Sequence, residues 1–317
     1  MDSGARNSSF AWLQLLRLAN GLTAVADVAM GYLVTHGDLR PYGYFVSLAA
    51  ASCLLYLSGM VLNDVFDVGV DARERPQRPI PSGRVSLSSA AAVGWAMLSS
   101  GVLVAWFISF MVGNWRPGAV ATLLAVCVVL YDAVLKRTPV APLAMGACRT
   151  LNVLLGMSLA PLAAEAASPY VRWGTTATWL IAIGIGVYIV GVTIFARTEA
   201  RASSRTRLIA GLAVLLAGMA LLAATPALSS YDPPLKVSLN GWYLLWAALA
   251  LITARRCGLA VTEPSQARVQ AAVRHCVQSI IVLDATVCVG YASPLWGLVV
   301  LSLIFPTVLL AQWLKAT

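Results

Sequence analysis

The sequence predicts an all-α, polytopic membrane protein, and three observations lead to that prediction. Hydrophobic residues make up 59% of the 317 residues and charged residues only 11%, with a mean hydropathy of +0.79, a combination that soluble domains do not show. Apolar runs near or above the ~18–20 residues that cross a bilayer recur along the whole chain. The runs are continuous rather than alternating and far longer than ~10 residues, which argues against a closed β-barrel.

Ten apolar segments are expected to form membrane helices. They cover residues 11–35, 43–66, 87–112, 117–135, 140–164, 174–197, 207–227, 239–256, 267–290 and 293–314. The segment 267–290 is the weakest, because it contains Arg268, Arg274, His275 and Asp284. We therefore expect one domain over residues 1–317, an all-α bundle with nine spans, or ten if this segment also crosses. Residues 1–10 form a short polar N-terminal segment without the features of a cleavable signal peptide.

The loops between these segments alternate in charge. The loops after the second, fourth, sixth and eighth segments, together with the N-terminus, carry thirteen basic residues, whereas the opposite loops carry four. Because basic loops stay in the cytoplasm, we expect the N-terminus and the acidic segment near residue 64 at the cytoplasmic face of the plasma (inner) membrane.

The net charge of +9 does not indicate a nucleic-acid partner. The basic residues lie in short loops and form no stripe with exposed aromatic residues on a soluble module. Six cysteines are scattered through apolar segments without a Cys-x-x-Cys pair, so a zinc site is not expected.

The segment from Asn63 to Arg84 carries the strongest chemical signal. Asp64, Asp67 and Asp71 are spaced i, i+3 and i+7, so on one helix they would project within roughly a 60° arc. Three crowded carboxylates at a helix C-terminus repel one another and oppose the helix dipole. A divalent cation relieves both effects, and oxygen ligands shared with phosphate suit Mg²⁺.

The order Asn-Asp-x-x-Asp-x-x-x-Asp, followed by Arg-x-x-Arg-Pro-x-Pro-Ser-Gly, resembles the first signature of the UbiA-type intramembrane prenyltransferase superfamily. The segments that begin at Tyr131 (Tyr-Asp-Ala-Val-Leu-Lys-Arg-Thr-Pro) and at Cys148 (Cys-Arg-Thr-Leu-Asn-Val-Leu-Leu-Gly) look most like its EboC-like branch. The resemblance runs from about residue 12 to the C-terminus.

This resemblance implies a UbiA-like bundle of membrane helices that surrounds a transferase site. The enzyme would bind an isoprenyl diphosphate through Mg²⁺ and ionise its allylic carbon–oxygen bond. It would then pass the prenyl group to an unidentified aromatic, indole or hydroxyl acceptor within the membrane, in contact with membrane lipid. Asp64 and Asp67 would then bind metal, with Asn63 as a further ligand or orienting amide. Asp71 would bind metal or pair with the cluster between Arg73 and Arg78. Lys136 and Arg137 correspond to a basic pair that meets the diphosphate in the family; a membrane-anchoring role is the alternative.

One departure concerns the second acidic motif of the family, usually Asp-x-x-x-Asp at the end of the sixth span. The chain has Arg197-Thr-Glu199-Ala-Arg201 at this place. The two arginines could grip the diphosphate directly and replace a second metal. Alternatively, ionisation has been lost and the chain binds or moves a prenyl lipid.

The remaining site candidates lie inside or beside the spans. Asp132 could pair with Lys136 or supply an acidic ligand, and Tyr131 precedes it. Arg149 and Asn152 share a helix face and could meet an anionic substrate group or form a structural pair. Arg17 and Asn20 repeat that spacing, and Tyr188 could stabilise an allylic cation. No base for the acceptor proton is evident, and Asp284 has no obvious partner. A small-molecule transporter is a further alternative, but no internal repeat supports it.

Overall fold

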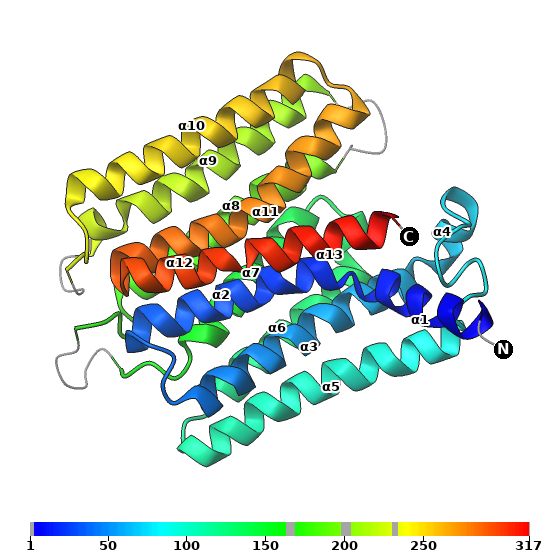
Figure 1. Ribbon diagram of the computed structural model, residues 1–317, viewed down its shortest axis with the longest axis horizontal. Helices are drawn as coiled ribbons and strands as arrows, with labels where there is room; N and C mark the ends of the chain where they lie inside the picture. Colours follow the sequence, from blue (N-terminus) through cyan, green and yellow to red (C-terminus); the bar gives the residue numbers. More distant parts are fainter. Residues whose placement is uncertain (1–2, 163–168, 198–203, 230–233, 317) are drawn as a thin grey trace.

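The computed structural model describes residues 3–162, 169–197, 204–229 and 234–316. Within these residues the chain is a bundle of long, roughly parallel helices, and both termini lie at one end (Figure 1). In chain order the elements are α1 Ser3–Leu16, α2 Leu18–His36, α3 Tyr42–Phe66, α4 Val68–Glu74, α5 Leu87–Val112, α6 Arg116–Ala133, the 3-10 turn η1 Leu135–Arg137, α7 Ala141–Met157, α8 Thr176–Ala196, α9 Arg205–Leu228, α10 Leu239–Thr262, α11 Gln266–Tyr291, α12 Pro294–Ser302 and α13 Ile304–Ala316.

The all-helical membrane architecture is confirmed, but the expected nine or ten spans are not. Eight helical segments in the described part of the chain are long and apolar enough to cross a membrane, and nine if the bent pair α1–α2 forms one span. The described part of the predicted segment 140–164, which ends at residue 162, contains only the 17-residue helix α7, because the chain leaves the helix after Met157. The segment 267–290, expected to be the weakest, forms the 26-residue helix α11 and passes the same test.

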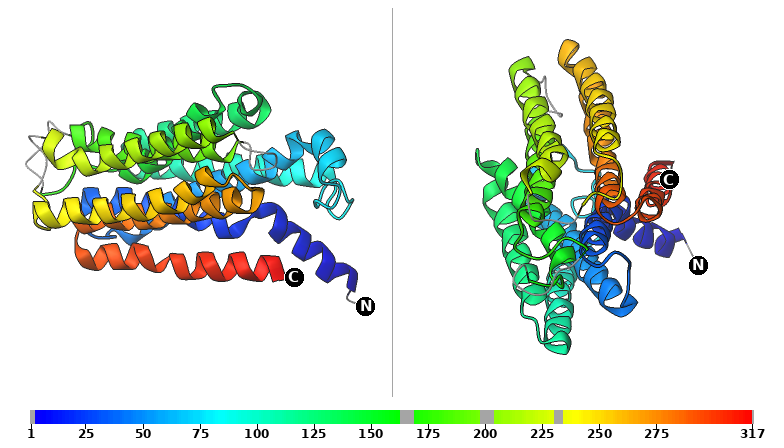
Figure 2. Two further views of the ribbon diagram at one scale, coloured as in Figure 1. Left: turned by 90° about the horizontal axis from the view of Figure 1, so that it is seen from above. Right: turned by 90° about the vertical axis from the view of Figure 1, so that its left-hand side faces the viewer.

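The core of the bundle is built around α2, which packs against α3, α7 and α11. Helix α5 flanks α3, and α8 joins α7 to α9. Seen end-on, the pair α8–α9 and the pair α10–α11 extend from this core as two diverging arms (Figure 2). The candidate site lies in the core, between α3, α6 and α7 and beside the α1–α2 junction.

The closest approach of α2 and α7 depends on glycine. A Cβ placed on Gly156 would lie 2.6 Å from the backbone oxygen of Val28, and one placed on Gly31 would lie 2.7 Å from that of Val153. Real Cβ atoms do not approach backbone oxygens so closely, so only glycine permits this spacing.

Gly156→Ala is therefore expected to lower the free energy of unfolding by about 1–3 kcal/mol, because α2 must move away from α7. The thermal unfolding midpoint in detergent measures this effect. Gly258→Ala in α10 is the matched control, since a Cβ there meets no atom within 4 Å. Equal midpoints for the two variants would contradict the proposed close packing.

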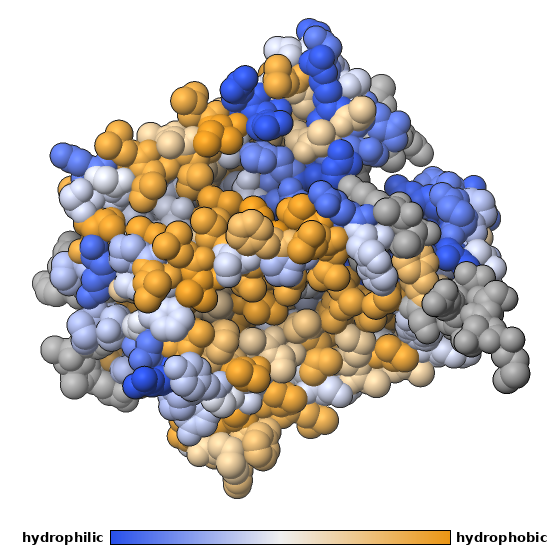
Figure 3. Space-filling view, viewed as in Figure 1, coloured by the Kyte–Doolittle hydropathy of each residue, from blue (hydrophilic) through white to orange (hydrophobic). Residues whose placement is uncertain are grey.

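The outer surface matches a lipid environment. Hydrophobic residues cover the middle of the face shown in Figure 3, and hydrophilic residues gather towards the ends. On α12 and α13, Leu298, Phe305 and Leu309 are exposed. Helix α4 and the basic loop behind it lie at the same end as both termini (Figure 1). The chain is thus an integral membrane protein with its acidic motif at one end of the bundle.

Candidate functional site

A break between α1 and α2 places Arg17 at the site. The two helices meet at a bend of 46°, and Arg17 adopts φ 48°, ψ 44° at the junction. This left-handed conformation is uncommon for a residue with a side chain and persists only where surrounding contacts hold it. The contact here is an ion pair, in which Arg17 Nη2 lies 2.7 Å from Asp64 Oδ1.

A second break separates the three aspartates that were expected on one helix face. Helix α3 ends at Phe66, Asp67 (φ −94°, ψ 2°) caps it, and α4 begins at Val68. Asp64 and Asp71 are buried, at 5% exposure each. The three aspartates therefore do not lie on one continuous helix: the chain turns at Asp67, which pairs with other cations than Asp64 and Asp71 do.

Arg78 holds the carboxylates of Asp64 and Asp71 together. Its Nη1 lies 3.2 Å from Asp64 Oδ1 and 2.6 Å from Asp71 Oδ2. Of the two roles expected for Asp71, the structure shows the ion pair with the arginine cluster. Burial of both carboxylates strengthens these charge-assisted hydrogen bonds relative to exposed ones.

Asp67 has separate partners from the segment after α6. Lys136 Nζ lies 2.8 Å from Asp67 Oδ2, and Arg137 Nη2 lies 3.4 Å from Oδ1. Lys136 also donates to Asn63 Oδ1 at 3.2 Å. The side chain of Lys136 is 11% exposed, whereas that of Arg137 is 64% exposed, so Lys136 faces the site and Arg137 lies at its rim.

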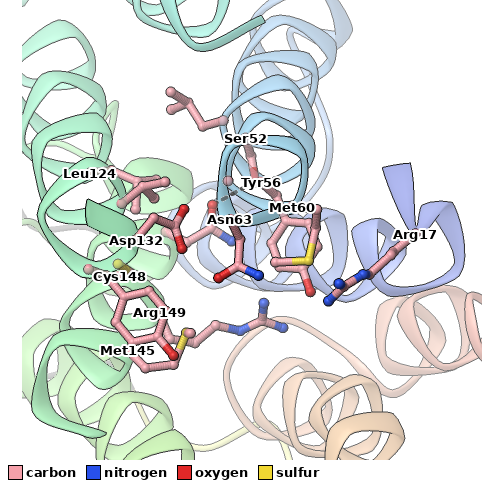
Figure 4. Close-up of a pocket in the computed structure, with 15 residues that line it drawn as sticks. Arg17, Ser52, Tyr56, Met60, Asn63, Leu124, Asp132, Met145, Cys148 and Arg149 are labelled. Carbon is pink, nitrogen blue, oxygen red and sulfur yellow. Dashed lines mark hydrogen bonds between the residues drawn. The ribbon is translucent and has the colours of Figure 1, made fainter. Parts of the chain in front are cut away.

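A cavity of about 250 Å³ opens directly below this cluster. Its polar lining comes from the three helices α3, α6 and α7 and from the α1–α2 junction, while Leu55, Leu124 and Val128 contribute apolar surface. The polar and aromatic residues in the lining are Arg17, Ser52, Tyr56, Asn63, Tyr131, Asp132, Arg149 and Asn152. Figure 4 shows Arg17, Asn63, Asp132 and Arg149 around the same space. The cavity thus joins a highly charged mouth to a more apolar interior.

A buried polar layer lies behind the cavity wall. Arg149 Nε is 2.8 Å from Asp27 Oδ2, and Asn152 Nδ2 donates to the same oxygen at 2.8 Å. Ser52 donates to Asn152 Oδ1 at 2.6 Å. Asp284 contacts Asp27 from α11. Arg149 Nη2 has no hydrogen-bond partner in the described part of the protein although it is buried, so it remains able to bind a ligand in the cavity.

The remaining predicted residues lie elsewhere. Asn20 and Tyr188 do not line the cavity, and the Tyr188 hydroxyl donates to the carbonyl oxygen of Cys276 at 2.9 Å. Arg73 lines a shallow surface depression beside Arg137. Arg197 is exposed and donates to the carbonyl oxygen of Thr138 at 2.9 Å, close in sequence to the basic pair. Glu199 and Arg201 lie outside the described residues.

The donor set at the cavity mouth fits Mg²⁺. Among residues 3–162, 169–197, 204–229 and 234–316, no three His, Cys, Asp or Glu side chains lie close enough together to coordinate one metal ion. Mg²⁺ in phosphate sites usually takes only one or two carboxylates, with water and phosphate oxygens completing its shell. Asp64 and Asp67, with the amide oxygen of Asn63, supply such hard oxygen donors.

Asp27 is the buried charged residue near the cavity that the sequence interpretation missed. An acid in the middle of an otherwise apolar span is expensive and usually functional, and this signal was available at position 27. The structure also places Asp284 beside Asp27, although neither oxygen of the Asp284 carboxylate has a hydrogen-bond partner among the described residues. Neither contact follows from sequence spacing, because Asp27, Arg149 and Asp284 belong to three different helices.

Comparison with protein families identifies the chain over most of its length. Residues 24–272 match the UbiA prenyltransferase family. A digeranylgeranylglyceryl phosphate synthase of Methanoculleus marisnigri is 34% identical over 130 residues, which cover 41% of this chain and 44% of that protein. The match therefore spans less than half the length of this relative.

Solved structures share the fold. A structure concerning digeranylgeranylglyceryl phosphate synthase in membranes has a TM-score of 0.63 at 19% identity and covers 90% of this chain and 99% of the other. A UbiA homologue from Archaeoglobus fulgidus bound to DMAPP and Mg²⁺ has a TM-score of 0.60 at 14% identity, over 92% and 99% of the two chains. These findings do not single out the EboC-like branch, which stays a prediction.

Proposed function

The chain belongs to the UbiA prenyltransferase family, and from that membership we propose that it transfers an isoprenyl group from an isoprenyl diphosphate to a hydroxyl group of a lipid acceptor. The reaction would depend on Mg²⁺ and take place in one domain over residues 1–317. The observation that carries this proposal is the cavity below the Asp64–Asp67 cluster, which joins a charged mouth to an apolar interior.

The charged mouth supports binding of the diphosphate. Arg17, Arg78 and Lys136 converge there, and each is held in place by an aspartate. When bound, Mg²⁺ would neutralise part of the diphosphate charge and so favour its departure. The basic side chains released from Asp64 and Asp67 could then bind the phosphate oxygens, which are strong acceptors for charge-assisted hydrogen bonds.

The interior supports a prenyl chain and a polar acceptor. Leu55, Leu124 and Val128 line it without polar atoms that would require hydrogen bonds. Arg149 projects into the same space from α7 (Figure 4) and retains a buried N–H without a partner in the described residues. A phosphate or carbonyl oxygen of the acceptor would satisfy it. The relative from Methanoculleus marisnigri, named a digeranylgeranylglyceryl phosphate synthase, favours a glycerophosphate lipid over an aromatic acceptor.

The orientation follows from the basic loops. Helix α4, the segment after α6 and both termini lie at the same end of the bundle (Figure 1). By the charge rule for membrane proteins this end faces the cytoplasm. The diphosphate group of the isoprenyl substrate and Mg²⁺ would therefore reach the mouth of the cavity from the cytoplasm.

The second candidate function is binding or movement of a prenyl lipid without chemistry. The observation that favours it is Arg197, which occupies the place of an expected acid and binds the Thr138 carbonyl oxygen rather than facing the cavity. We prefer the transferase, because the first motif, the basic cluster and the cavity are all present in one region.

Reconstituted protein tests the proposal. We expect geranylgeranyl diphosphate, Mg²⁺ and a glycerophosphate lipid with one free hydroxyl to yield a prenylated lipid, detected by mass spectrometry, with an equal amount of diphosphate. EDTA should abolish the product. An aromatic acceptor supplied instead of the lipid tests the aromatic acceptor that the family resemblance implied. Diphosphate binding without product from either acceptor would favour the lipid-binding alternative.

A further inference from the structure

Asp132 differs from every other aspartate around the cavity. Asp64, Asp67 and Asp71 each pair with at least one cation within 3.4 Å. Asp132 is only 3% exposed and lines the cavity. Within the part of the chain that the structure describes, no hydrogen bond or ion pair reaches its carboxylate. A buried acid without a hydrogen-bond or ion-pair partner is costly, which favours a functional role for this position.

We propose that Asp132 is the general base of the transfer and accepts the proton that the acceptor hydroxyl releases. This inference rests on the proposed function and supplies the base that the sequence did not reveal. It assigns to Asp132 a role different from metal binding and from pairing with Lys136.

The chain separates Asp132 from Lys136, although the two are four residues apart. Helix α6 ends at Ala133, Val134 adopts φ −130° and ψ −55°, and the chain continues as the 3-10 turn η1. Lys136 consequently reaches across to Asp67 and Asn63 of the α3 segment. Had α6 continued, the two side chains would share a helix face and could form the pair that the sequence predicted.

The charged groups around Asp132 come from all the elements packed on it. Arg17 approaches from the α1–α2 junction, Asp64 and Asp67 from the end of α3, and Lys136 from η1. Arg149 and Cys148 of α7 line the same cavity, as do Tyr56 of α3 and Tyr131 of α6. Arg17, Lys136 and Asp67 have ion-pair partners of their own. Asp132 is therefore exposed to the electrostatic field of these groups but forms an ion pair with none of them.

The carboxylate is also accessible from the cavity. In Figure 4, it faces the space shared with Asn63 and Arg149. Gly59 lies opposite on α3, and a Cβ at that position would come within 3.9 Å of Asp132 Oδ2 and 3.0 Å of Val128 Cγ1. Glycine at position 59 thus keeps a side chain away from this oxygen.

In the proposed step, the bond between C1 of the prenyl group and the diphosphate oxygen breaks, and its electron pair leaves with the diphosphate. The acceptor oxygen forms a new bond to C1 while its O–H bond breaks and the proton moves to Asp132. Asp132 later returns the proton to water, which restores the carboxylate for the next cycle.

Asp132→Asn tests the role, because asparagine keeps the shape of the side chain but accepts no proton. Three quantities are measured on reconstituted protein: Mg²⁺-dependent binding of geranylgeranyl diphosphate, slow diphosphate release without acceptor, and transfer to the lipid hydroxyl. We expect binding and release to stay at the wild-type level while transfer falls by about 100-fold or more. Asp132→Glu, which retains a carboxylate, should recover most of the transfer.

Asp38→Asn is the matched control, since Asp38 lies in the loop after α2 and accepts a hydrogen bond only from its neighbour Arg40 in the described structure. Unchanged transfer in Asp132→Asn would overturn the proposal and leave the departing diphosphate as the proton acceptor. Joint loss of binding, release and transfer, with transfer also lost in Asp132→Glu, would overturn it in favour of a metal or structural role. Wild-type protein that binds diphosphate but transfers to no acceptor would refute the proposed function itself, and the base would fall with it.

Discussion

Asp64→Asn is expected to abolish Mg²⁺-dependent binding of isoprenyl diphosphate and to reduce transfer by about 10²–10³-fold or more. Asp64 accepts hydrogen bonds from Arg17 at 2.7 Å and Arg78 at 3.2 Å through one oxygen. Asparagine has nearly the same shape, but it lacks the charge that attracts the metal and orients both arginines. Calorimetric titration of geranylgeranyl diphosphate at several Mg²⁺ concentrations measures the loss.

Glu263→Gln provides the comparison for this variant. Glu263 forms an ion pair with Arg268 at 2.7 Å, but its side chain is 67% exposed and lies between α10 and α11, outside the cavity lining. Its replacement should leave binding unchanged. Mg²⁺-dependent binding that survives in Asp64→Asn would contradict the assignment of Asp64 as a metal ligand.

Asp27→Leu is expected to lower the free energy of unfolding by about 3–5 kcal/mol. The substitution removes the partner of a buried arginine, and an uncompensated charge in a protein interior is strongly destabilising. Arg149 Nε and Asn152 Nδ2 each lie 2.8 Å from Asp27 Oδ2, so the substitution removes an ion pair and a hydrogen bond together. The thermal unfolding midpoint of the detergent-solubilised protein reports the change.

The double variant Asp27→Leu/Arg149→Met separates charge from packing. Because it removes both members of the pair, it should recover a large part of the lost stability, whereas independent effects would simply add. A loss below about 1 kcal/mol in Asp27→Leu alone would mean that Asp284 takes over the pairing with Arg149. The layer would then not depend on Asp27.

The architecture and the first motif could be predicted because they depend on local sequence. Long apolar runs determine the membrane helices, and the spacing from Asn63 to Arg84 points to a phosphate and metal site. Asn63, Tyr131 and Arg149 line the cavity, and Asp64 pairs with Arg17 of its lining, while their roles in binding metal and substrate stay predictions. Expectations of this kind require only that helices form and that polar residues avoid lipid.

Other features depend on how separate helices meet, so the sequence could not show them. The left-handed turn at Arg17 and the break at Asp67 change which side chains face one another. The expected helical periodicity would have placed Lys136 on Asp132, but η1 directs it to Asp67. Asp27 and Asp284 meet although they are far apart in sequence, and only the packing of α2 against α11 joins them.

The metal dependence of diphosphate binding by the wild-type protein tests the central claim most directly. Reconstituted protein is titrated with geranylgeranyl diphosphate, with and without Mg²⁺, while release of free diphosphate is followed. A functional ionisation site at the Asp64–Asp67 cluster predicts tight binding only with Mg²⁺, together with slow diphosphate release. Equal binding in both conditions, or no binding in either, would contradict it.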